Sequence, residues 1–187
     1  IFVAEVASTV NELLLANYML KNSKNKDEKL AIINHILDLY KATLYRQTMF
    51  AEFEKETHKL REKGEVLTSE LLSNTYYNLV KKYFGPNVLC DDLIRYEWAR
   101  IPHFYYNFYV YKYATGISAA SYIVDGILNN KEGALENYIN FLKTGGSMYP
   151  LDELKIAGVN LNSKSVVLSA IKTFEKYLKE FKDIYNS

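Results

Sequence analysis

Two acidic residues interrupt a strongly apolar opening stretch, "IFVAEVASTVNELLL", which contains Glu5 and Glu12. If this stretch is a helix, residues seven apart lie on one side of it, so both carboxylates share a face with Ser8 between them. The apolar residues that take much of the rest are Val6, Val10, Leu13 and Leu14. Glu5 would then stand at the edge of a buried seam, as a metal ligand or a catalytic acid. The ordinary alternative is a solvated acid on an exposed helix face.

A zinc site usually needs three protein ligands, so a lone carboxylate requires partners. The chain has three histidines, His35, His58 and His103, and its sequence contains no HExxH motif. In "FEKETHKLRE", His58 has Glu54 and Glu62 one helical turn away on either side, which could hold a metal weakly. Such spacing is common on exposed charged helices, where it forms ordinary side-chain pairs. His35 lies in an apolar neighbourhood and is expected to be a packed or half-exposed helix residue.

The stretch "ARIPHFYYNFYVYKYATG" combines a histidine with many phenols. His103 follows Pro102, and tyrosines occupy positions 105, 106, 109, 111 and 113. On a helix continuing from His103, Tyr106 and Tyr113 would share a face, with Tyr109 nearby. Hydroxyl groups beside an imidazole could line a polar cleft and donate to a developing oxyanion or a peptide carbonyl. A stripe of aromatic packing explains the same residues equally well.

Composition narrows the classes of protein to consider. A chain of 187 residues is one domain or a large piece of one, and 49% apolar residues suffice for a core. The 23 basic and 22 acidic residues leave a net charge of +1, which indicates no general attraction to nucleic acid or membranes. Cys90 is the single cysteine, which excludes an internal disulfide and favours the cytoplasm. The acids in the opening stretch argue against a signal peptide or a membrane span.

Apolar residues spaced by three and four predict helices along almost the whole chain, and no alternating strand pattern is visible. The expected helices cover residues 2–21, 27–62, 69–83, a segment from about 91 to Pro102, an aromatic segment from there to about 128, 131–143 and 163–185. Gly64 and Gly85 are placed to end two of them. Pro102 predicts a break or kink, because proline lacks a backbone N–H. The sequence therefore predicts an all-α domain, with a loop at "KTGGSMYPLDELKIAGVNL".

Four stretches together resemble a known family. "FVAEVASTVNELLL", "RQTMFAEFE", "RIPHFYYNFYVYKYATG" and "GGSMYPLDELKIAGVNL" are similar, in this order, to the C-terminal part of oligoendopeptidase F, a zinc metallopeptidase of the thimet oligopeptidase family. The resemblance spans nearly the whole chain. It implies that residues 1–187 are the C-terminal portion of a helical catalytic domain with a deep substrate cleft. The HExxH helix and the N-terminal lobe would lie upstream, so we expect the chain to be a fragment.

The resemblance implies a role for the opening acid. In the family an HExxH helix supplies two histidine ligands and the general base, and a glutamate on a following helix is the third zinc ligand. That glutamate matches "AEVAS", so Glu5 is the implied ligand of the single zinc. Glu12 could orient a histidine ligand from the other part of the enzyme, or could be a plain helix-face acid.

The family also places a histidine and tyrosines opposite the zinc, where they bind substrate and stabilise the tetrahedral intermediate. His103, Tyr106 and Tyr113 match that motif best. More distant members have a longer, glycine-containing loop after the histidine, and one of their tyrosines falls at Val110 here. Tyr109 is therefore the alternative substrate-binding residue.

The function implied by the resemblance is zinc-dependent hydrolysis of short peptides by a cytoplasmic endopeptidase. Its partners would be peptide substrates and the upstream part of the same enzyme, with no nucleic acid and no membrane. This chain alone would be inactive, because two zinc ligands and the general base are missing from it. Two alternatives stay open: a non-catalytic helical module that binds a peptide or a partner helix, and a related helical zinc carboxypeptidase that needs a free substrate C-terminus.

Overall fold

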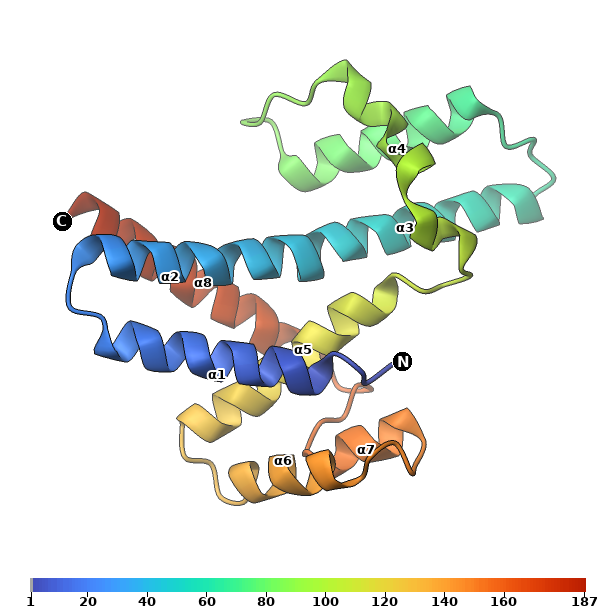
Figure 1. Cartoon of the computed structure of the whole chain (residues 1–187). Helices are drawn as coiled ribbons and strands as arrows, with labels where there is room; N and C mark the ends of the chain where they lie inside the picture. Colours follow the sequence, from blue (N-terminus) through green and yellow to red (C-terminus); the bar gives the residue numbers. More distant parts are fainter. Residues whose placement is uncertain (1) are drawn as a thin grey trace. The chain divides into compact units, whose positions relative to one another are not determined.

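The protein is built of helices, and no strand occurs among residues 2–187, which are the residues described by the computed structural model (Figure 1). The all-α prediction is confirmed. The α-helices are α1 Val6–Asn22, α2 Lys26–Tyr40, α3 Arg46–Glu62, α4 Ser69–Phe84, α5 Tyr111–Leu128, α6 Ala134–Lys143, α7 Pro150–Ile156 and α8 Lys164–Asn186. Shorter segments are the π-helical turn Lys41–Tyr45 and the 3₁₀ helices Asp92–Arg100 and Pro102–Tyr105.

The chain forms two compact units, and the first combines Ile1–Leu44 with Thr115–Ser187. Within this first unit α2 packs against both α1 and α8, and α6 packs against α7 (Figure 1). Its core is apolar and includes Val10, Leu13, Ile33, Ile36, Tyr40, Ile117, Leu154 and Ala170. The Tyr40 hydroxyl lies 2.6 Å from Ser121 Oγ, which itself donates to the Ile117 carbonyl, so Tyr40 is the donor of the pair. Burial raises the pKa of Tyr40 to about 12.

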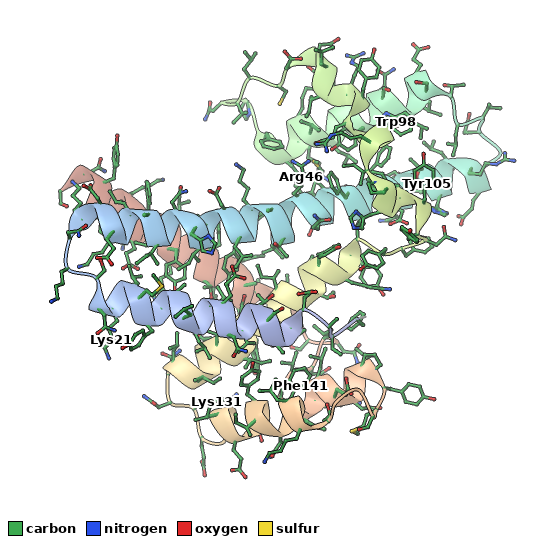
Figure 2. All side chains as sticks on the ribbon, in the orientation of Figure 1. Lys21, Arg46, Trp98, Tyr105, Lys131 and Phe141 are labelled. Atoms are coloured by element: carbon green, nitrogen blue, oxygen red, sulfur yellow. The ribbon has the colours of Figure 1, made fainter. Side chains whose placement is uncertain are left out.

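The second unit, Tyr45–Ala114, is organised around aromatic side chains. Helix α4 packs against α3 on one side and against the 3₁₀ helix Asp92–Arg100 on another. The Phe53 ring lies 5.3 Å from the Tyr76 ring and 5.2 Å from the Phe104 ring, in tilted or edge-on contacts that aromatic pairs prefer. Trp98 packs against this cluster and donates its indole N–H to Ser73 Oγ (Figure 2).

The glycine and helix-spacing predictions agree well with the structure. Helix α4 ends at Phe84, followed by Gly85 with a φ of 74° that favours glycine. The long helix expected over 27–62 is present, but its turn Lys41–Tyr45 has π-helical geometry. The predicted loop after residue 143 contains the short helix α7, which starts at Pro150 in the position where proline is best tolerated. No helix within residues 2–187 combines the length and hydropathy required to cross a bilayer.

The region around Pro102 differs from the sequence prediction. The expected helices on both sides of the proline are 3₁₀ segments, residues 106–110 are non-helical, and α5 begins only at Tyr111. Ile101 adopts the extended φ of −88° and ψ of 103° that a residue before proline favours. A helix continuing from His103 was therefore the wrong geometry for placing the tyrosines.

We expect Phe53→Ala to destabilise the second unit by about 3–5 kcal/mol, because it removes a buried ring from the aromatic cluster. Phe84→Ala is the matched control, since Phe84 is 41% exposed, and it should cost well under half as much. Urea unfolding followed by fluorescence is suitable, because the single tryptophan, Trp98, lies in this unit. Equal losses in the two variants would contradict this description of the core.

Candidate functional site

Glu5 lies at the start of α1, with its carboxylate oriented by a neighbour one turn along. The Ser8 hydroxyl lies 2.8 Å from Glu5 Oε2 and 3.0 Å from the Glu5 carbonyl oxygen. The Glu5 side chain is exposed. An accessible carboxylate with one oxygen held by a hydroxyl is suited to act as one ligand of a metal ion.

Glu12 has a partner on the next helix of the same unit. Its Oε1 lies 3.1 Å from Nε2 of His35, and the two side chains are 43% and 63% exposed. His35 is therefore more exposed than its apolar neighbourhood in the sequence suggested. Such a solvated pair contributes at most about 1 kcal/mol to stability.

In the second unit, His103 and two tyrosines form a compact cluster. The Tyr113 hydroxyl lies 3.1 Å from His103 Nε2, and the two rings meet edge-on at 5.7 Å. The Tyr109 ring lies 5.4 Å from the imidazole and 5.7 Å from the Tyr113 ring. Tyr106 is 64% exposed and reaches the cluster through the Tyr109 ring, 6.3 Å away. Tyr109 thus lies against His103, whereas Tyr106 lies at the solvent edge.

Successive tight turns, rather than a helix, bring these side chains together. The Tyr106 N–H donates to the His103 carbonyl at 3.0 Å, and the Tyr109 N–H donates to the Tyr106 carbonyl at 3.1 Å. Between them Phe108 has a φ of 53°, in the left-handed region that bulky residues rarely occupy. That conformation costs about 1–2 kcal/mol, which other contacts must offset.

Sequence reasoning missed a buried carboxylate, Glu97, five residues before the start of the 3₁₀ helix Pro102–Tyr105 that contains His103. Glu97 is 8% exposed and forms ion pairs with Arg46 and Arg100, while the Tyr76 hydroxyl donates to its Oε2 at 2.6 Å. Nothing in "RYEWAR" distinguishes this acid from an exposed one. The cluster ties α3, α4 and the 3₁₀ helix together directly before the His103 turn.

The same cluster shifts two pKa values. Burial acts to raise the pKa of Glu97, but the Tyr76 hydrogen bond and the charges of Arg46 and Arg100 outweigh it, and the net pKa lies below its usual range. Burial, followed by the hydrogen bond to the Glu97 carboxylate, raises the pKa of Tyr76 well above its usual range. The arrangement is stable as a carboxylate that accepts from a neutral phenol.

The weak metal site suggested around His58 is not formed. Glu54 is 4% exposed and accepts from the Phe108 N–H at 2.5 Å, while the His58 ring lies 4.7 Å from the Phe108 ring. Glu62 is exposed. Within residues 2–187 no three His, Cys, Asp or Glu side chains gather closely enough to hold a metal ion.

These donors fit zinc only in part. A carboxylate such as Glu5 is a normal zinc ligand, but a complete site usually needs three protein ligands. The described residues can therefore contribute one ligand to a shared site, and its other donors would come from outside them.

Comparison with known proteins decides the family. The profile of peptidase family M3 matches residues 1–173. The chain belongs to peptidase family M3. This agrees with the resemblance to oligoendopeptidase F drawn from the four sequence stretches.

Several known oligopeptidases are closely similar to this chain in sequence or structure. It is 52% identical to oligopeptidase PepF of Bacillus subtilis over 184 residues, which are 98% of this chain and 28% of that protein. It is 51% identical to an oligoendopeptidase F homolog of Borreliella burgdorferi over 186 residues, which are 99% of this chain and 31% of that protein. The crystal structure of oligoendopeptidase F from Enterococcus faecium matches with a TM-score of 0.95 and 47% identity, covering 99% of this chain and 36% of that one. The chain spans about a third or less of the length of these M3 relatives.

The Glu97 cluster predicts acid sensitivity. Because the pKa of Glu97 is lowered on folding, its contribution to stability is present above about pH 4.5, the value in the unfolded chain, and is lost as pH falls through the lower folded value. Glu97→Gln should reduce the acid slope of unfolding free energy measured by Trp98 fluorescence. At pH 7 it should also cost about 1–3 kcal/mol, since buried polar partners lose an acceptor.

A smaller slope must remain in that variant, because the Lys82 hydrogen bond lowers the pKa of Glu52 in the same unit. Glu65→Gln, at an exposed position, is the control and should behave as the parent does. An unchanged acid slope in Glu97→Gln would contradict the assignment.

Proposed function

We propose that this chain is the C-terminal portion of the helical catalytic domain of a zinc-dependent endopeptidase that hydrolyses short oligopeptides. Membership of peptidase family M3 and similarity to proteins named oligoendopeptidase F support this proposal. The observation that carries it on the structural side is the contact between His103 and the Tyr113 hydroxyl, at 3.1 Å, with Tyr109 packed against both rings. A phenol and an imidazole held together are suited to donate hydrogen bonds to a carbonyl oxygen as it gains charge.

Glu5 would be the zinc ligand supplied by this chain, with two histidines from the upstream part of the enzyme as the others. The Ser8 hydroxyl, 2.8 Å from Glu5 Oε2, would restrict the rotation of the carboxylate and so favour one orientation. Zinc, when bound, supplies Lewis-acid chemistry that polarises a carbonyl and makes water more acidic. Glu12 would help to orient the site only if the upstream part of the enzyme reaches it, since its partner in this chain is His35.

The roles of the aromatic residues follow from the geometry of the cluster. The His103 imidazole and the Tyr113 hydroxyl, with His103 Nε2 and the phenolic oxygen 3.1 Å apart, would face the substrate oxyanion as hydrogen-bond donors. Tyr106, at the solvent edge, and Tyr109, against the imidazole, would contact the peptide. These donors favour the transition state over the substrate, because the oxygen carries more charge there.

Two consequences concern the chain by itself. Without the upstream histidines and the general base it should neither retain zinc nor hydrolyse peptides. We place the whole enzyme in the cytoplasm, where a free thiol such as Cys90 stays reduced.

Glu5→Gln in the full-length enzyme should lower zinc affinity and peptide cleavage together, because a neutral amide is a poorer zinc ligand than a carboxylate. Zinc content by atomic absorption and cleavage of a fluorogenic peptide are the measurements. Glu136→Gln, an exposed substitution on α6 of the same unit, is the control and should leave both unchanged. If Glu5→Gln keeps its zinc and its activity, Glu5 is only a helix-face acid.

Tyr113→Phe should lower kcat by about 10²–10³-fold with zinc retained, as expected when one oxyanion donor is lost. Tyr105→Phe is the matched control, because Tyr105 is 82% exposed and ends the 3₁₀ helix that contains His103. Normal turnover in both Tyr113→Phe and Tyr106→Phe would remove the tyrosines from the mechanism.

The proposed endopeptidase can be separated from a carboxypeptidase by amidating the substrate. Equal cleavage of a peptide and its C-terminally amidated form would support endopeptidase action, whereas loss of cleavage on amidation would indicate a carboxypeptidase.

A further inference from the structure

Helix α3 buries a carboxyl side chain, Glu54, to which the proposed zinc chemistry gives no role. Glu54 is 4% exposed and lies next to Phe53 of the aromatic cluster. Burying a carboxylate is costly unless it is well paired or hydrogen-bonded. Glu54 Oε1 accepts the backbone N–H of Phe108 at 2.5 Å. The carboxylate therefore acts on the backbone of the loop that follows His103.

The residue that Glu54 binds is also the strained one. Phe108 has a φ of 53°, and together with Asn130 it is one of two residues other than glycine with positive φ in the described part of the chain. His58, one helical turn after Glu54, packs its ring 4.7 Å from the Phe108 ring. Helix α3 thus holds both the backbone and the side chain of Phe108. A strained conformation of this kind persists only where surrounding contacts maintain it, and such residues concentrate at functional sites.

The strained residue directly precedes Tyr109. The Tyr109 N–H bonds to the Tyr106 carbonyl at 3.1 Å, and the Tyr109 ring packs 5.4 Å from the His103 ring. Any change of backbone angles at Phe108 therefore moves Tyr109 relative to His103. We propose that Glu54 is a positioning residue, which holds residues 106–110 so that Tyr109 stays packed on His103. Its effect on catalysis rests on the proposed peptidase function, but its effect on the loop does not.

Positioning and stability can be separated at this residue. Replacing Glu54 by an apolar side chain of similar size leaves the Phe108 N–H without its acceptor, which is destabilising, but it also removes the cost of burying a carboxylate. Glu54→Leu should therefore keep the second unit folded while releasing the Phe108 N–H. Glu54→Gln retains an acceptor oxygen without the charge and should preserve part of the bond. Glu56→Gln makes the same chemical change two residues away, at a half-buried position, and is the matched control.

The first measurement is amide hydrogen exchange of residues 106–110 in this chain, read by NMR. The Phe108 amide should exchange about tenfold faster or more in Glu54→Leu, less so in Glu54→Gln, and at the parent rate in Glu56→Gln. Trp98 fluorescence during urea unfolding shows whether each variant is folded. Unchanged exchange at Phe108 in a folded Glu54→Leu would overturn the proposal, as would equal acceleration throughout the second unit.

The second measurement is peptide cleavage by the full-length enzyme. Glu54→Leu should lower kcat on the order of tenfold or more at unchanged zinc content, because a displaced Tyr109 no longer has the geometry that the transition state requires. Glu54→Gln should recover part of the loss. A kcat that falls only with the folded fraction would show a purely structural role. If the parent enzyme cleaves no peptide, the proposed function fails, while the exchange rates still decide whether Glu54 holds the loop.

Discussion

The missing N–H of Pro102 is the constraint on which the second unit depends. It prevents the chain from continuing as one helix, and Ile101 before it takes an extended conformation. The backbone then passes through a short 3₁₀ helix and further turns before α5 starts at Tyr111. A straight helix would space His103 and Tyr113 ten residues, or about 15 Å, apart along its axis. The turns instead bring the Tyr113 hydroxyl to 3.1 Å from the imidazole.

Two buried carboxylates stabilise this irregular segment at its two ends, in different ways. Glu97, before Pro102, is neutralised by Arg46 and Arg100 and bonded by Tyr76. Glu54 instead accepts a main-chain N–H at Phe108, near the end of the segment. Both carboxylates are themselves buried, at 8% and 4% exposed, and both adjoin the aromatic core: Tyr76 bonds to Glu97, and Phe53 precedes Glu54 on α3. Hydrogen bonds in such surroundings are stronger than in water, which suits them to hold a loop without regular structure.

Local sequence predicted the helices, the glycines that end them and the break at Pro102. Helix propensity and hydrophobic spacing depend only on residues within a few helical turns of one another, so these features can be read without knowing the tertiary contacts. Proximity of His103 to Tyr109 and Tyr113 was anticipated, but on a continuous helix that does not form. Glu54 and Glu97 could not be recognised as buried, because their partners Phe108 and Arg46 are 54 and 51 residues away in sequence. Glu5 was singled out by family resemblance, since its exposed geometry alone resembles that of many surface acids.

Phe108 brings two demands into conflict at one position. Its backbone conformation is easiest for glycine, asparagine or aspartate, whereas its ring is what packs on His58. Glycine there would remove the strain but would give the unfolded chain more freedom to lose and the loop more conformations to visit. A β-branched residue would fit neither demand. Phenylalanine at this position therefore keeps the ring contact with His58 at the cost of backbone strain, whereas a small residue would relieve the strain and leave the loop less ordered.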